Sequence, residues 1–72
     1  MEIVNFLLTF NGETIPCKFE NDDVNFTLHK FAFIDGGWVT SADLPKRGML
    51  PLYLALDTLP CWGITEGDTV TA

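Results

Sequence analysis

The sequence contains little positive charge. Four Lys and Arg stand against ten Asp and Glu, which gives a formal net charge of −6 over 72 residues. Proteins that bind phosphate backbones carry a basic patch or stripe, so this balance disfavours direct binding to nucleic acid. An acidic surface keeps a protein soluble and speeds its encounter with a partner that displays basic groups. We therefore expect any protein partner to have a basic surface, although charge of this kind often serves solubility alone.

Long apolar runs and cysteines are also scarce. The longest apolar run, 49–56, is far shorter than the roughly 20 residues of a membrane-spanning helix, and the N-terminus lacks the pattern of a secretory signal. We therefore expect a cytoplasmic protein with no membrane contact. Cys17 and Cys61 form no C-x-x-C pair and have no second set of metal ligands nearby, which disfavours zinc. Both are expected to be buried thiols, with a disulfide between them as the alternative.

No group of residues has the spacing of a known catalytic or metal site. The single histidine, His29, has no nucleophile or orienting carboxylate placed near it by the sequence. Glu20, Asp22 and Asp23 form an acidic cluster, but the ligand spacing of a calcium loop is missing. We expect no enzymatic activity, no resident metal and no cofactor.

Apolar residues, in contrast, are plentiful. They make up 47% of the chain and include six Phe and two Trp, so the protein folds, and its length allows one domain over 1–72. Alternating apolar residues from Glu2 to Phe10 lead into Asn11-Gly12, a strong signal for a tight hairpin. The expected register places opposite each other Phe10 and Glu13, Leu8 and Ile15, Phe6 and Cys17, and Val4 and Phe19. Pro16 should leave that edge of the second strand unpaired.

The rest of the chain predicts a second hairpin, a helix and a final strand. Val24, Phe26 and Leu28 alternate with polar residues as a third strand, and the contiguous apolar run 31–34 predicts a bulge or bend near 29–31. A turn at 35–37 leads into a strand over 38–40, with the register left open by its two glycines. A loop over 41–48 precedes an apolar helix over 50–59, which should be enclosed on most sides, and a last strand covers 69–71.

These elements predict an α+β fold. We expect a small antiparallel sheet of four to five strands, built from two β-hairpins and a short C-terminal strand, with one short apolar helix packed on it. One core of this size cannot easily enclose all the apolar residues, since Ile3 and Leu7 place them on the second face of the first strand as well. The surplus should close a homo-oligomer or dock on another protein.

The function that this pattern favours is stoichiometric binding. We expect a small inhibitor or accessory subunit that blocks a basic surface of another protein, for example a nucleic-acid-binding surface. The candidate partner-binding residues are Glu20, Asp22, Asp23, Phe31, Trp38 and Trp62. Core packing is the competing role for the aromatic ones. The alternative function is a homo-oligomeric binder of a small anionic or nucleotide-like ligand, held by Lys46 and Arg47 ahead of the helix.

Overall fold

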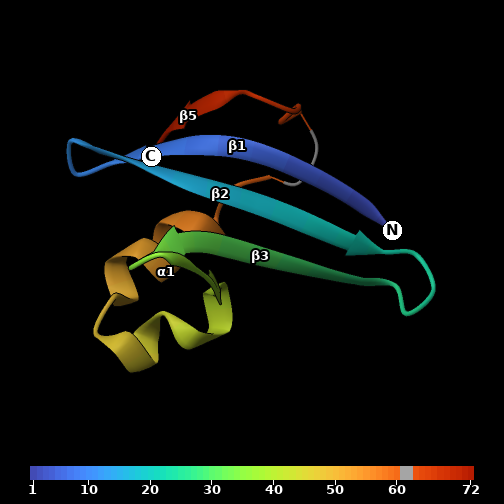
Figure 1. Ribbon diagram of the computed structural model, residues 1–72, viewed down its shortest axis with the longest axis horizontal. Helices are drawn as coiled ribbons and strands as arrows, with labels where there is room; N and C mark the ends of the chain where they lie inside the picture. The colour runs from blue at the N-terminus through green and yellow to red at the C-terminus, as the bar shows by residue number, and fades with distance from the viewer. Residues whose placement is uncertain (61–62) are drawn as a thin grey trace.

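A computed structural model describes residues 1–60 and 63–72 and confirms the α+β class. Five strands form one sheet in the order β4-β3-β2-β1-β5 (Figure 1). The elements are β1 (Glu2–Phe10), β2 (Glu13–Asp22), β3 (Thr27–Ile34), β4 (Gly37–Thr40), the 3-10 turns η1 (Ser41–Asp43) and η2 (Pro45–Arg47), α1 (Leu50–Asp57) and β5 (Thr69–Thr71). The sheet is mostly antiparallel, with β5 running parallel to β1.

The first hairpin forms in the predicted register. Asn11 and Gly12 both have positive φ, at 51° and 78°, and the ladder pairs β1 with β2 from Phe10 and Glu13 onward. This is the geometry that a two-residue turn of the I′ kind requires. The prediction for Pro16 is also confirmed, because the β2–β3 ladder stops at Cys17, one residue short of the proline. Proline has no N–H to donate, so β3 separates from β2 at this point.

The prediction for the start of the third strand is wrong. Val24 and Phe26 lie in the turn between β2 and β3, and β3 begins at Thr27. The reason is local: the Asp22 carboxylate accepts hydrogen bonds from the backbone N–H groups of Val24 (3.0 Å) and Asn25 (3.3 Å), which closes a turn where alternation alone predicted a strand.

The predicted bulge near residues 29–31 is absent from the ladder, which pairs β2 and β3 residue by residue from Asp22–Thr27 to Cys17–Ala32. The apolar run instead alternates normally. Ala32 and Ile34 share the face of the core, whereas Phe31 and Phe33 lie on the other face. A strand whose two faces are both apolar needs no bulge to explain consecutive hydrophobic residues.

The second hairpin closes with a two-residue turn, which resolves the register that the sequence left open. Asp35 and Gly36 have φ of 51° and 81°, and Ile34 pairs with Gly37. Trp38 therefore lies opposite Phe33, on the face of the sheet away from the core. The second glycine of the pair is the first residue of β4 rather than part of the turn.

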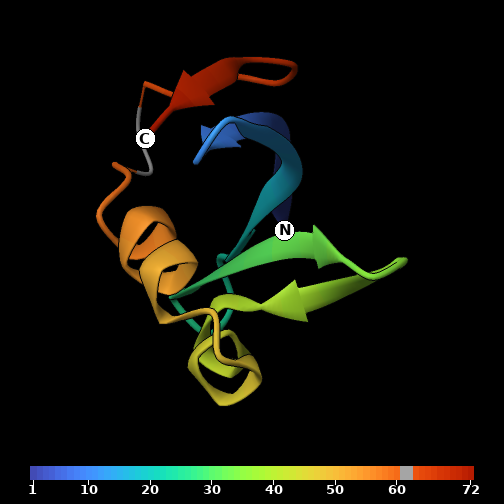
Figure 2. The same cartoon turned by 90° about the vertical axis from the view of Figure 1, so that its left-hand side faces the viewer.

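The helix lies on the inner, concave face of the sheet (Figure 2). Leu52 and Leu56 enter the core together with the buried side chains of Phe6, Leu8, Cys17, Phe19, Ala32, Val39 and Leu44. The helix ends at Asp57, two residues before its expected end, and it is less enclosed than predicted, since Leu50 and Leu54 remain about half exposed. An eight-residue helix on one sheet face can bury only the stripe that meets the sheet.

Across residues 1–60 and 63–72, no helix has both the length and the apolar character needed to cross a bilayer. Cys61 and Trp62 lie outside the described residues. Two predictions therefore lie outside them as well: the alternative of a Cys17–Cys61 disulfide and the partner contact at Trp62.

Candidate functional site

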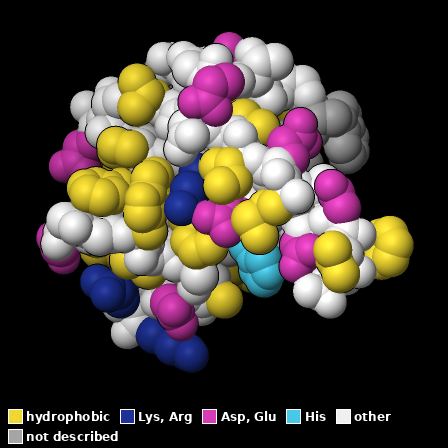
Figure 3. Space-filling model, turned by 45° about the vertical axis from the view of Figure 1, so that its right-hand side comes forward, with side chains coloured by type: hydrophobic (Ala, Val, Ile, Leu, Met, Phe, Trp, Pro, Cys, Tyr) yellow, Lys and Arg dark blue, Asp and Glu magenta, His cyan; other side chains and the backbone are white. Residues whose placement is uncertain are grey.

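The face of the sheet opposite α1, here called the outer face, carries large hydrophobic side chains that the fold leaves uncovered. Ile3, Leu7, Phe33 and Trp38 are each between 39% and 47% exposed. The ladder registers place all four on this one face. Hydrophobic side chains gather here around a basic side chain (Figure 3). Clustered exposed hydrophobic groups on a small domain mark an interaction surface more often than isolated ones do.

Lys18 lies at the centre of this face and is largely buried by its neighbours. Its Nζ is 4.6 Å from the ring centroid of Trp38 and 4.9 Å from that of Phe31, and it contacts a Glu20 carboxylate oxygen at 2.8 Å. The two side chains of the ion pair are only 17% and 21% exposed. The ammonium is thus held by two ring faces and one carboxylate, which fixes the rings in place and cancels the charge locally.

The aromatic groups of the outer face also pack on each other. Phe33 meets Trp38 edge-on, with centroids 5.3 Å apart and planes at 76°, across the β3–β4 ladder. His29, beside Phe31 on β3, has its ring centroid 6.5 Å away and lies opposite Glu20. Three of the predicted contact residues, Glu20, Phe31 and Trp38, are therefore brought together around Lys18.

A hollow of about 260 Å³ borders this cluster on its β5 side. Its lining residues include Leu7, Pro16, Trp38 and Glu66. One Glu66 carboxylate oxygen accepts a hydrogen bond from the backbone N–H of Asn5 at 2.8 Å, which anchors the turn before β5 against β1. The outer face is thus an apolar surface with a hollow and with carboxylates at its borders.

Asp22 and Asp23 lie apart from the aromatic cluster, at the turn that joins β2 to β3. The pKa of Asp22 is lowered, mainly by the hydrogen bond from the Asn25 side chain at 2.8 Å and further by the backbone N–H groups of Asn25 and Val24. Asp23 lies 4.0 Å from the N-terminal ammonium of Met1. Asp23 is exposed, whereas Asp22 is partly exposed and has a structural role in its own turn.

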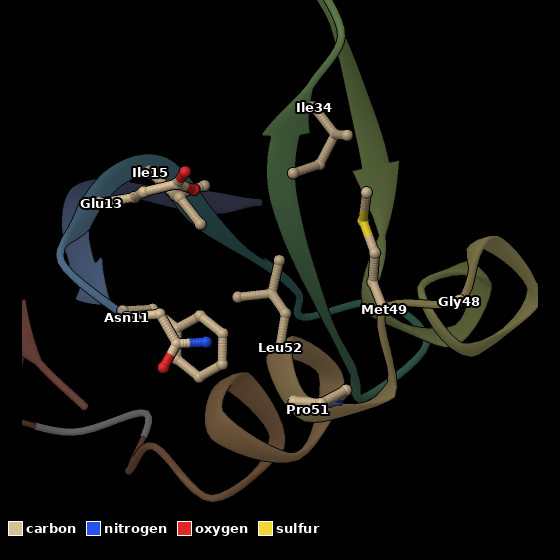
Figure 4. Close-up of a pocket in the computed structure, with 9 residues that line it drawn as sticks. Asn11, Glu13, Ile15, Ile34, Gly48, Met49, Pro51 and Leu52 are labelled. Atoms are coloured by element: carbon tan, nitrogen blue, oxygen red, sulfur yellow. The ribbon is translucent and has the colours of Figure 1, made fainter.

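Lys46 and Arg47, the candidate anion ligands, lie in η2 beside the start of α1. Lys46 is 3.6 Å from an Asp43 carboxylate oxygen, and neither basic residue lines the neighbouring cavity of about 350 Å³ (Figure 4). That cavity is open to solvent and is lined by the end of the first hairpin, Ile34, Gly48, Met49 and the first turn of α1, and Glu13 is the charged group among the described residues that line it. A carboxylate there opposes an anionic ligand.

Metal-ligating side chains do not gather in threes anywhere in the described part of the chain. The contacts that sequence reasoning missed are Lys18, Phe33 and Glu66. Lys18 and Phe33 could have been found by extending the register of the first hairpin across the sheet, because both then fall among apolar neighbours on the second face. Glu66 could not, since nothing in the local pattern indicates that β5 adds to β1.

No family model, curated protein or solved structure matches this chain.

Proposed function

We propose that this protein is a stoichiometric protein-binding module, an inhibitor or accessory subunit, whose outer face covers a basic surface of another protein. The observation that carries the proposal is the uncovered apolar cluster of the outer face, opposite a core that α1 already closes. Trp38 and Phe33 supply the large, rigid rings that dominate the energetics of protein interfaces. Because Lys18, paired with Glu20, holds the Trp38 ring, and because Phe33 packs edge-on against that ring, little side-chain entropy remains to be lost on binding.

Charge supports a basic partner. Lys18, which lies among the aromatic rings of the outer face, is paired with Glu20, while Asp22 and Glu66 border the same face. The chain as a whole carries a net charge of −6, so its field attracts basic surfaces and slows approach to nucleic acid. We keep the cytoplasm as the proposed compartment, where the buried Cys17 thiol would stay reduced.

A second copy of the chain is the other proposed occupant of the outer face, in line with a homo-oligomer. Light scattering coupled to gel filtration measures this directly. We expect a mass above 8.0 kDa that rises with concentration, and the mass should return to 8.0 kDa when Trp38 and Phe33 are both replaced by Ser. A mass of 8.0 kDa for the unmodified protein at all concentrations would refute self-association and leave the outer face to a different protein.

The test of the function compares two double variants, each of which replaces two partly exposed hydrophobic side chains. Trp38→Ser/Phe33→Ser removes rings from the outer face, and Leu50→Ser/Leu54→Ser removes side chains from α1 that are at least as exposed in relative terms. Each is immobilised and used to capture proteins from a cell extract, with captured proteins quantified by mass spectrometry at low and high salt. Circular dichroism confirms that both variants fold.

We expect a partner that the unmodified protein and the α1 variant retain, that the outer-face variant loses, and that salt weakens, since attraction between exposed charges is screened. The result that would contradict the proposal is the same set of captured proteins for all three proteins. Capture that increases with salt would contradict the basic character of the partner.

A further inference from the structure

The turn between β2 and β3 projects from one end of the sheet and displays the two most exposed large hydrophobic side chains of the described residues. Val24 is 85% exposed and Phe26 is 92% exposed. The turn lies at the opposite end of the molecule from α1 (Figure 1). In the space-filling view hydrophobic groups stand out there with acidic side chains beside them (Figure 3). These two side chains contribute almost no buried area to the fold.

Phe26 also adopts a backbone conformation that its type disfavours. Its φ is +53°, in the left-handed region that glycine and asparagine occupy readily and bulky residues avoid. At the two other tight turns of the sheet, the positive-φ positions hold Asn11, Gly12, Asp35 and Gly36, which are residue types that adopt positive φ at little cost. An exposed phenylalanine at such a position is therefore unexplained by folding, and residues of this kind cluster at functional sites.

The turn is nevertheless well fixed. The Asp22 carboxylate accepts hydrogen bonds from the backbone N–H groups of Val24 and Asn25 and from the Asn25 side chain, at 3.0, 3.3 and 2.8 Å. Asp22 and Thr27 close the ladder beneath the turn. Val24 and Phe26 are thus presented on a preformed support, which lowers the entropy lost when they bind.

We propose that Val24 and Phe26 form an anchor that inserts into an apolar pocket with a basic rim on the partner protein. The inference rests on the proposed function and extends it, because Asp22 lies on the outer face two residues beyond Glu20 along β2. The carboxylates of Asp22, which is partly exposed, and Asp23, which is exposed, flank the anchor and match a rim of Lys and Arg. The same carboxylates oppose an anionic membrane and a second copy of this acidic chain.

The experiment places the photoreactive amino acid p-benzoylphenylalanine at position 26, at position 38 on the outer face, or at position 54 on α1 as the control. After irradiation in a cell extract, the crosslinked peptides are identified by mass spectrometry. We expect positions 26 and 38 to crosslink to one protein, with the position 26 crosslink falling on apolar residues next to Lys or Arg. Position 54 should not crosslink to that protein.

Binding is then measured with the purified partner. Phe26→Asn should weaken affinity at least tenfold, the loss typical of a buried aromatic anchor, while Tm stays level or rises by up to roughly 5 °C because asparagine tolerates the left-handed conformation. Asp22→Asn/Asp23→Asn retains an accepting oxygen for the turn and should slow association several-fold at low salt.

Crosslinks from position 38 without any from position 26 would overturn the anchor and leave the outer-face proposal standing, whereas no crosslink from either position would overturn both. The anchor is also overturned if position 26 crosslinks only to a second copy of the chain. Pelleting with phosphatidylcholine vesicles that depends on Phe26 would overturn it in favour of a membrane. An unchanged association rate for Asp22→Asn/Asp23→Asn would refute the basic rim.

Discussion

Lys30 connects the sheet to the end of the helix, and replacing it with methionine should destabilise the protein strongly. Its ammonium donates hydrogen bonds to the backbone carbonyls of Leu56 (3.2 Å) and Asp57 (3.0 Å) at the C-terminus of α1 and to that of Leu59 (3.2 Å), two residues beyond the helix. The last carbonyls of a helix have no partner within the helix, and the helix dipole makes this end negative. Lys30 is half-buried, with Nζ 5.7 Å from the centroid of the Phe19 ring.

The magnitude follows from these contacts. A hydrogen bond to a charged group contributes about 1.5–3 kcal/mol, and a cation at a partly buried helix C-terminus contributes up to about 2 kcal/mol. Because one ammonium makes all three bonds, the contributions overlap, and we expect a loss of about 3 kcal/mol for Lys30→Met. A domain of this length has a total stability on the order of 4–11 kcal/mol, so the loss is a large fraction of it.

Urea unfolding of Lys30→Met measures this loss, with Lys46→Met as the control. Lys46 is 81% exposed and makes one long ion pair with Asp43, so its removal should change the free energy of unfolding by less than about 0.5 kcal/mol. Methionine keeps most of the lysine side chain's length, so the comparison isolates the ammonium. A loss below about 0.5 kcal/mol for Lys30→Met would refute the reasoning.

Two further predictions concern pH. Burial raises the pKa of the Cys17 thiol from 9.0 to about 12, so the unfolded chain releases this proton at a lower pH than the folded protein does. The free energy of unfolding should therefore fall by about 1.4 kcal/mol per pH unit above pH 9, relative to that of Cys17→Ala. Urea unfolding at pH 8 and pH 10 checks this, and equal slopes for the two proteins would contradict it. The pKa of Asp22 is lowered in the folded protein, mainly by the hydrogen bond from the Asn25 side chain. The ionised carboxylate therefore stabilises the fold above the unfolded pKa of about 4, and this contribution is lost as pH falls through the folded pKa. Tm should therefore drop less between pH 5 and pH 3 in Asp22→Asn than in the unmodified protein, and equal drops would show that the carboxylate does not support the turn.

Local pattern was enough to predict the first hairpin, the unpaired edge at Pro16, the helix start at Leu50 and the final strand. These features depend on neighbours in sequence: a two-residue turn with positive φ fixes the register of the strands that flank it, and proline lacks a donor wherever it lies. Pattern failed at Val24 and Phe26, because an aspartate that closes a turn overrode the alternation of apolar residues.

The candidate site was predictable in kind and only partly in composition. Ile3 and Leu7 were enough to predict the second apolar face of the first strand. The enclosure of Lys18 by Phe31 and Trp38, in contrast, involves three strands. Its geometry depends on the register of the second hairpin, which the two glycines of its turn left open.

The parallel pairing of β5 with β1 and the contact of Lys30 with the end of α1 join segments more than 25 residues apart in the chain. Contacts of this kind are selected by which surfaces remain unpaired once the local elements have formed, and that choice belongs to the tertiary structure alone.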